Sequence, residues 1–289
     1  MTSRLRELTE ETRARGHKAL VPFLTAGYPD KETSLRLLVA AVRSGCRVVE
    51  VGIPFSDPMA DGPVIQAASE QALAHGMTLA HALELVARAS AEAPAGYVVM
   101  SYLNPILQMG VARFAERAAR AGVCGVILPD VPLEESVELR GELARAGITL
   151  VYLVAPTSGE DRVAAIARQA DGFLYLVSLT GVTGAREGLA AGLEDFVARA
   201  RRASDLPLYV GFGVSTPEQA AAVVCSGADG VIIGSALIRI VRDTPDARAA
   251  EAAVSAFLAR VAAAMAGASA DAGNGAGPEA GEARRETRP

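Results

Sequence analysis

The sequence predicts a single α/β domain of the (β/α)8 barrel type. Eight short apolar runs alternate with longer amphipathic segments along most of the 289 residues. The runs are continuously apolar, which is typical of strands buried on both faces of a parallel sheet. Several amphipathic segments end in a glycine directly before the next run, as at Gly45, Gly122, Gly147 and Gly227, and this is a helix C-cap signal. Eight strand–helix units are the number that closes such a barrel.

The elements follow in order along the chain. The expected strands are Ala19–Leu24, Val48–Val51, Tyr97–Ser101, Gly125–Leu128, Thr149–Val154, Phe173–Val177, Leu208–Val210 and Gly230–Ile233. The expected helices include Lys31–Ser44, Val111–Ala121, Leu133–Ala146, Asp161–Ala170 and Thr216–Ser226. The barrel domain is expected over residues 1–266. Residues 267–289 are rich in Gly, Ala, Glu and Pro, and we expect a disordered tail there.

A doubly wound open sheet is the alternative fold. That fold usually carries a glycine-rich loop after its first strand, whereas the loop Thr25–Pro29 fits no dinucleotide fingerprint.

Composition excludes several classes of protein. The net charge of −5 argues against a nucleic-acid-binding surface. The segment before Lys18 is charged, unlike a signal peptide. The Ala-rich segment 247–266 contains three charged residues and is expected to be an amphipathic surface helix and not a membrane span. Three cysteines (Cys46, Cys124 and Cys225) fit no zinc spacing, so we expect small buried residues in a reducing cytoplasm.

Two carboxylates are the first candidates for catalysis. Glu50 lies near the end of an apolar strand, where an ionised carboxylate is costly to bury, and Asp61 follows in a proline-rich turn. A capped strand end and an Asp-Gly turn would give the same local pattern. Active sites of barrels lie at the C-terminal ends of the strands, however, and both residues belong to that end.

Glycine-rich loops after the last two strands predict a phosphate site. Gly211–Val214 follows the seventh strand and Gly234–Ala236 follows the eighth, and tight turns are the alternative reading. The loop Ser178–Arg186 has small residues that suit a mobile lid or a plain flexible loop.

Other mechanisms lack their residues. The two lysines, Lys18 and Lys31, lie away from the strand ends, so a Schiff-base route has no nucleophile. The three histidines (His17, His75 and His81) also lie outside the strand ends, and no cluster has metal-ligand spacing. General acid–base catalysis by carboxylates remains.

Several short motifs along the chain match those of one protein family. They are Pro22–Gly27, Glu50–Ala67, Asn104-Pro105, Leu128–Pro132, Gly181–Gly184, Gly211–Gly213 and Gly234-Ser235. With them the chain resembles the tryptophan synthase alpha chain family across roughly residues 5–265. The resemblance implies reversible retro-aldol cleavage of indole-3-glycerol phosphate to indole and glyceraldehyde 3-phosphate. It also implies that this chain has no cofactor.

The resemblance assigns roles to individual residues. Glu50 would move protons between indole C3 and the glycerol hydroxyl, Asp61 would bind the indole N–H, and Tyr175 is the third catalytic candidate. The expected substrate-binding residues are Phe23, Ile65, Tyr102, Leu128, Thr183, Gly184, Phe212, Gly213, Gly234 and Ser235.

The resemblance also implies a partner. A beta subunit that uses pyridoxal phosphate would form an αββα assembly and receive the indole. Its expected contacts are Pro54, Asp57, Pro58, Asn104 and Pro132. Three alternatives remain open: a stand-alone lyase that releases indole, a non-catalytic regulatory subunit, and another phosphosugar barrel. The regulatory subunit would not need both carboxylates, and the other barrels would need strand-end lysines.

Overall fold

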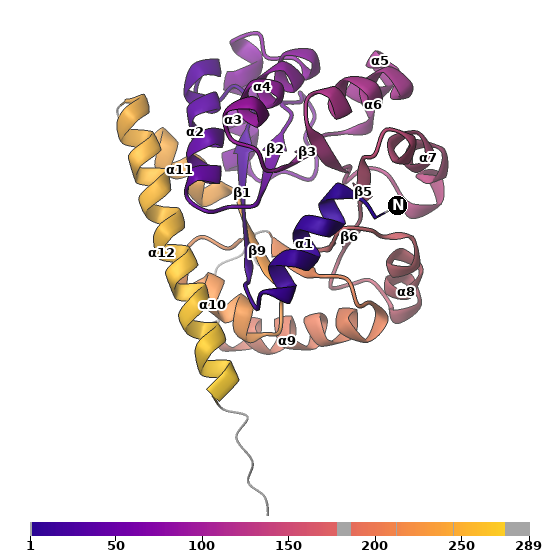
Figure 1. The fold of residues 1–289 in the computed structure, drawn as a ribbon, viewed down its shortest axis with the longest axis vertical. Coiled ribbons are helices and arrows are strands. Elements are labelled where there is room, and N and C mark those ends of the chain that lie inside the picture. The colour runs from indigo at the N-terminus through magenta and orange to yellow at the C-terminus, as the bar shows by residue number, and fades with distance from the viewer. Residues whose placement is uncertain (1, 178–185, 212, 245, 275–289) are drawn as a thin grey trace, which may run out of the picture.

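Parallel strands form a barrel inside a ring of helices (Figure 1). The structure is a computed structural model that describes residues 2–177, 186–211, 213–244 and 246–274, without the side chains of 186–191 and 270–274. The strands are β1 (Ala19–Thr25), β2 (Val48–Gly52), β3 (Gly96–Met100), β4 (Val123–Ile127), β5 (Thr149–Val151), β6 (Leu153–Val154), β7 (Leu174–Val177), β8 (Leu208–Gly211) and β9 (Gly230–Ile233). The helices are α1 (Arg4–Ala14), α2 (Lys31–Arg43), α3 (Pro63–Ala74), α4 (Leu79–Glu92), α5 (Leu103–Met109), α6 (Val111–Arg120), α7 (Val137–Arg145), α8 (Glu160–Gln169), α9 (Arg186–Ala203), α10 (Pro217–Cys225), α11 (Ser235–Arg242) and α12 (Ala247–Asn274), with a 3-10 turn at Leu133–Glu135.

The strand order shows how the barrel closes. The hydrogen-bonded order is β5-β4-β3-β2-β1-β9-β8-β7-β6, and the pairs are parallel. Only Tyr152 separates β5 from β6, and its carbonyl oxygen accepts a 3.1 Å hydrogen bond from the Tyr175 N–H. The predicted strand Thr149–Val154 therefore joins both ends of the sheet, and the barrel prediction is confirmed.

Local chemistry explains where the helices begin and end. The carboxylate of Asp30 accepts from the Thr33 N–H at 2.9 Å and begins α2, and Thr78 and Thr216 cap α4 and α10 in the same way. Gly45 and Gly227 follow α2 and α10 with φ of 96° and 92°, a conformation that favours glycine. The predicted C-cap signals thus mark real helix ends.

Apolar side chains form an outer layer between strands and helices and an inner cluster inside the barrel. Leu5 of α1 belongs to the inner cluster and closes the N-terminal end of the barrel. A Cβ atom on Gly125 or Gly172 would lie 2.8 Å from a Leu5 methyl carbon. These glycines therefore leave the room that Leu5 fills, and α1 lies across the strands in Figure 1. We call this closed end the floor of the barrel.

Helix α12 packs along the outside of the barrel against α2, α10 and α11. By length and composition its segment Ala247–Ser269 could cross a membrane, with a mean hydropathy of 1.5. The face that includes Val254 and Leu258 is buried against the barrel. The helix continues past Ala266 to Asn274, so the start of the expected tail is helical. Residues 275–289 lie outside the described residues.

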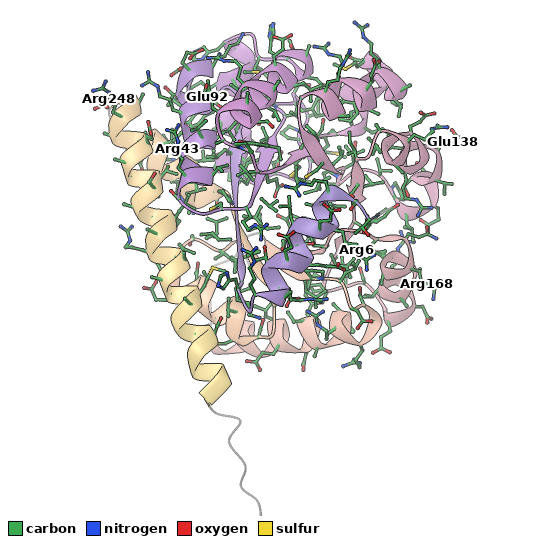
Figure 2. The ribbon with its side chains drawn as sticks, in the orientation of Figure 1. Arg6, Arg43, Glu92, Glu138, Arg168 and Arg248 are labelled. Atoms are coloured by element: carbon green, nitrogen blue, oxygen red, sulfur yellow. The ribbon has the colours of Figure 1, made fainter. Side chains whose placement is uncertain are left out.

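Charged and sulfur-bearing side chains divide between surface and interior. Arg43, Glu92 and Glu138 are exposed and point outward from the outer helices (Figure 2). Cys46 and Cys124 are buried free thiols, as expected. Cys225 is exposed, so the expectation of a third buried cysteine was wrong, because this residue lies on the solvent side at the end of α10.

Candidate active site

Glu50 is a buried carboxyl group that faces the barrel interior. Val48 belongs to the inner cluster, whereas Val49 and Val51 belong to the outer layer, so alternation along β2 turns Glu50 inward. Its side chain is 1% exposed, and neither carboxyl oxygen has a hydrogen-bond partner among the described residues. Burial, and then the charge of Asp61, raises the pKa of Glu50 to about 8. Glu50 is therefore mostly protonated at neutral pH and can donate a proton.

Asp61 lies in the loop between β2 and α3, where a tyrosine holds it. The Tyr102 hydroxyl donates to Asp61 Oδ2 at 3.2 Å and accepts from the Ala60 N–H at 3.0 Å. The Tyr102 ring stacks on Phe55 of the same loop, with 5.1 Å between ring centroids. Burial raises the pKa of Asp61 to about 6, and the Tyr102 hydrogen bond opposes that rise. Asp61 is thus ionised at neutral pH while Glu50 holds its proton.

Tyr175 completes the group from the opposite side of the barrel. It lies on β7 and is buried, and its register partner on β8 is Tyr209, two residues before Gly211. A Cβ atom on Gly211 would lie 2.3 Å from the Tyr175 hydroxyl oxygen, so this glycine makes room for the phenol. Burial, and then the charges of Glu50 and Asp61, holds the pKa of Tyr175 well above its usual value. The phenol therefore stays protonated beside the two carboxyl groups.

Apolar side chains surround these groups. Phe23 is in register with Glu50 on the neighbouring strand, and its ring lies against Gly52 and Gly234, where added Cβ atoms would come within 2.4 and 3.0 Å. Leu128 is buried, and the partly buried Ile65 packs against the inner cluster. Leu128 belongs to the outer layer, and the assignment of these residues as walls of an indole pocket stays a prediction.

A cavity of about 450 Å³ opens at this end of the barrel. Ala60, Leu128 and Val177 are among its lining residues. Glu50 and Tyr175 are not among its lining residues.

The expected phosphate site combines a glycine loop with the start of a helix. Gly213 is exposed with φ of 85°, and Gly234 precedes α11 with no side chain capping the helix. The first N–H groups of a helix have no partner within the helix, and they form the positive end of its dipole. Ser235 is the first residue of α11, and its hydroxyl accepts from Arg239 at 3.3 Å. Thr183, Gly184 and Phe212, also predicted here, lie outside the described residues.

The expected partner contacts gather on the loops after β2, β3 and β4. Asp57, Asn104 and Pro132 are exposed and Pro58 is partly exposed. Pro54 is buried in this chain, because the Ile53 N–H still donates to the Met100 carbonyl at 2.8 Å and keeps the chain on the barrel.

The sequence reasoning missed features of the same loops. Met59 is 88% exposed and Leu107 is 55% exposed, and large apolar residues in polar turns are a readable signal of a contact surface. Asp130 was also missed. Its carboxylate accepts from the Leu103 N–H at 2.9 Å and so caps α5 directly after Tyr102.

The structure does not show residues arranged as metal ligands. Across the described ranges, no group of three or more His, Cys, Asp or Glu side chains could hold a metal ion. Lys18 lies at the floor end, where its ammonium donates to the Ala228 carbonyl at 2.8 Å, so it is far from the strand ends that carry Glu50.

Comparison with known proteins identifies the family. The family model for the tryptophan synthase alpha chain matches residues 9–267. The alpha chain of Geobacter sp. (strain M21) is 49% identical over 237 residues, which cover 82% of this chain and 88% of the relative. That of Synechococcus elongatus is 49% identical over 226 residues, covering 78% and 85%.

Solved structures agree with this assignment. The alpha subunit from Legionella pneumophila matches with a TM-score of 0.84 at 38% identity. The match covers 92% of this chain and 100% of that subunit. A tryptophan synthase from M. tuberculosis in a ligand-free form matches with a TM-score of 0.81 at 35% identity, covering 91% and 99%. The chain therefore belongs to the tryptophan synthase alpha chain family, lyases that cleave indole-3-glycerol phosphate in tryptophan biosynthesis and need no cofactor of their own.

Proposed function

We propose that Glu50 and Asp61 divide the cleavage of indole-3-glycerol phosphate between them. The observation that carries this proposal is the pair of buried carboxyl groups with separated pKa values, about 8 for Glu50 and about 6 for Asp61. Titratable groups whose environments separate their pKa values are suited to distinct acid and base roles. At neutral pH one group carries a proton and the other a negative charge.

The proton of Glu50 goes to indole C3, and the positive charge that results lies on the ring nitrogen. The Asp61 carboxylate accepts the hydrogen bond of that N–H, and it stabilises the cation more than the neutral substrate. The Glu50 carboxylate then removes the proton of the hydroxyl on the adjacent carbon. The carbon–carbon bond breaks, and its electrons return to the ring. Indole and an aldehyde form, and Glu50 regains its proton.

Tyr175 and the glycine loops support the same step. The protonated Tyr175 phenol is a hydrogen-bond donor near both carboxyl groups, and we assign it the orientation of the reacting hydroxyl group. Gly213, Gly234 and Ser235 bind the substrate phosphate through backbone N–H groups at the start of α11. Phe23 and Leu128 pack on the two faces of the indole.

The beta subunit is the proposed partner. The exposed residues Asp57, Asn104 and Pro132 lie beside the exposed apolar side chains of Met59 and Leu107, which supports a contact surface at the catalytic end of the barrel. The assembly is αββα, indole passes directly to the partner, and pyridoxal phosphate belongs to the partner. The free thiols at Cys46 and Cys124 support a cytoplasmic location.

A pH–rate profile of the cleavage tests the division of roles. Indole release from indole-3-glycerol phosphate is measured from pH 5 to 9, with and without a beta subunit. We expect kcat/KM to rise as Asp61 ionises near pH 6 and to fall as Glu50 loses its proton near pH 8. A profile that is flat from pH 5 to 9 contradicts the assignment. Full activity without the partner favours a stand-alone lyase.

A further inference from the structure

The loop that carries Asp61 is held by side chains from two other elements. This loop connects β2 to α3 and ends at Gly62, directly before the helix. Tyr102, which follows β3, contacts the Asp61 carboxylate and the Ala60 N–H. The second contact comes from Gln66, near the start of α3. The proposed reaction assigns no role to this glutamine.

Gln66 folds back from α3 onto the loop. Its side-chain Nε2 donates to the Asp61 carbonyl at 2.8 Å and to the Pro58 carbonyl at 3.4 Å. An amide nitrogen carries two hydrogens, so it can serve both carbonyls at once. The backbone N–H of Gln66 also donates to the Gly62 carbonyl at 3.0 Å. A single residue therefore ties the start of the helix to three positions of the loop.

The backbone of Asp61 is fixed at both its N–H and its carbonyl. The N–H donates to the Pro58 carbonyl at 3.0 Å, and the carbonyl accepts from Gln66. The side chain is held separately, because its carboxylate accepts from Tyr102. A functional group must be held to within about 0.5 Å of its productive position, and neighbouring side chains that lock it supply this precision. Gln66 is placed to supply it through the backbone.

We propose that Gln66 is a positioning residue for the cleavage of indole-3-glycerol phosphate, which fixes the loop so that the Asp61 carboxylate stays at the indole N–H. This inference rests on the proposed role of Asp61. Gln66 acts through the Asp61 carbonyl and not on the reacting atoms.

Release of the loop changes Asp61 in a direction that can be measured. Burial keeps the pKa of Asp61 at about 6, above its usual value of 3.8. A loop that opens into water loses part of this burial, so the Asp61 pKa falls. Tyr102→Phe is expected to raise that pKa, because it removes a hydrogen bond to the carboxylate. The sign of the shift therefore distinguishes release of the loop from loss of a direct contact.

Gln66→Met tests the proposal, because methionine keeps the length of the side chain and removes the donor. Carbon-13 NMR of the full chain, labelled at its aspartate carboxyl carbons, follows the titration of Asp61, and Asp61→Asn identifies its signal. We expect the Asp61 pKa in Gln66→Met to fall by at least about half a unit. The kcat for indole release should fall about three- to tenfold, the scale of one lost neutral hydrogen bond. The Kd for glycerol 3-phosphate should not change.

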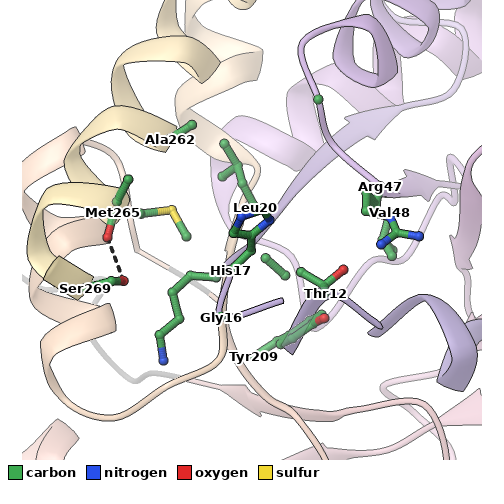
Figure 3. A pocket seen from close by; sticks show the side chains of 14 residues that line it. Thr12, Gly16, His17, Leu20, Arg47, Val48, Tyr209, Ala262, Met265 and Ser269 are labelled. Atoms are coloured by element: carbon green, nitrogen blue, oxygen red, sulfur yellow. Dashed lines mark hydrogen bonds between the residues drawn. The ribbon is translucent and has the colours of Figure 1, made fainter. Parts of the chain in front are cut away.

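Three further variants show whether the effect belongs to the Gln66 donor. Gln66→Lys restores a donor on a side chain of similar length and should recover most of kcat. Gln71→Met makes the same change on the same helix, where the amide donates to the Pro29 carbonyl at 3.2 Å. Ala262→Phe adds bulk at the floor of the barrel, where Ala262 of α12 lines a cavity of about 370 Å³ (Figure 3). Gln71→Met and Ala262→Phe should both keep the wild-type kcat and Asp61 pKa.

Each outcome bears on one of the two proposals. An unchanged Asp61 pKa or an unchanged kcat in Gln66→Met contradicts the positioning role. No recovery in Gln66→Lys, or an equal loss of kcat in Gln71→Met, also contradicts it. Cleavage by Asp61→Asn within a few-fold of wild type would instead refute the proposed role of Asp61. The NMR titration of Gln66→Met then still decides whether Gln66 holds the loop.

Discussion

Replacement of Glu50 by glutamine is expected to lower activity and to raise stability at alkaline pH. Glutamine keeps the shape of the protonated carboxyl group but cannot exchange a proton. Loss of a general acid–base group slows a reaction by about 10² to 10⁴. Indole release by Glu50→Gln should therefore fall at least about 10²-fold, and binding of glycerol 3-phosphate should not change.

The stability effect follows from the raised pKa of Glu50. A rise from 4.5 to about 8 corresponds to a free energy on the order of 5 kcal/mol. Because the folded protein holds this proton more tightly, the associated stability is fully present below pH 4.5 and is lost as pH rises to about 8. Glutamine cannot ionise, so the variant keeps this contribution at pH 8.5. The difference between variant and wild type should be small at pH 4.5 and up to several kcal/mol at pH 8.5.

Urea unfolding followed by circular dichroism measures this difference, since the chain has no Trp for fluorescence. Glu70→Gln is the matched control, because Glu70 is exposed on α3. The control should show neither the activity loss nor the pH-dependent stability. Glu50→Gln with activity within a few-fold of wild type would refute the catalytic role. Equal stability of variant and wild type at both pH values would refute the burial of an unpaired carboxyl group.

Three other variants test the surrounding groups. Tyr102→Phe removes a hydrogen bond to the Asp61 carboxylate, worth about 1.5 kcal/mol. The acidic limb of the kcat/KM profile should therefore move up by about one pH unit. An acidic limb that does not move would show that another group sets the Asp61 pKa. Ser235→Asp places a carboxylate in the first turn of α11, where it stabilises the helix but repels phosphate. The Kd for glyceraldehyde 3-phosphate should therefore rise more than about tenfold, and the thermal unfolding midpoint should not fall. An unchanged Kd places the phosphate elsewhere. Asp57→Ala should reduce stimulation by a beta subunit while the rate of the isolated chain stays nearly the same, and equal loss of both rates would assign Asp57 to the pocket.

Strands were easier to predict than helices. Each predicted run contains a strand, because a run of consecutive apolar residues can be recognised in the sequence without knowing which strands lie beside it. Helix α1 was missed although Leu5, Leu8, Thr9 and Thr12 form its buried stripe. Two of these four residues are threonines, and their hydroxyls bond to backbone carbonyls, so the stripe does not read as apolar.

The two carboxyl groups could be predicted from the sequence, but the contacts that hold their loops in place could not. Glu50 stands out as a charge within an apolar run. The hydrogen bond from Tyr102 to Asp61 joins residues 41 positions apart, and it depends on how the loops after β2 and β3 meet. Pro54 was expected at the partner interface by the family resemblance, yet the β2–β3 ladder continues through Ile53 and buries it.

The closed floor of the barrel determines by which end the substrate enters and the products leave. Leu5 fills the space that Gly125 and Gly172 leave at that end and Leu8 fills the space at Gly96, so apolar side chains close the rear of the barrel in the described part of the chain. Substrate and both products must therefore enter and leave through the catalytic end of the barrel, which also carries the proposed partner surface. A partner seated over the loops after β2, β3 and β4 could then receive indole directly. The phosphate product would leave on the opposite rim, past β8 and β9.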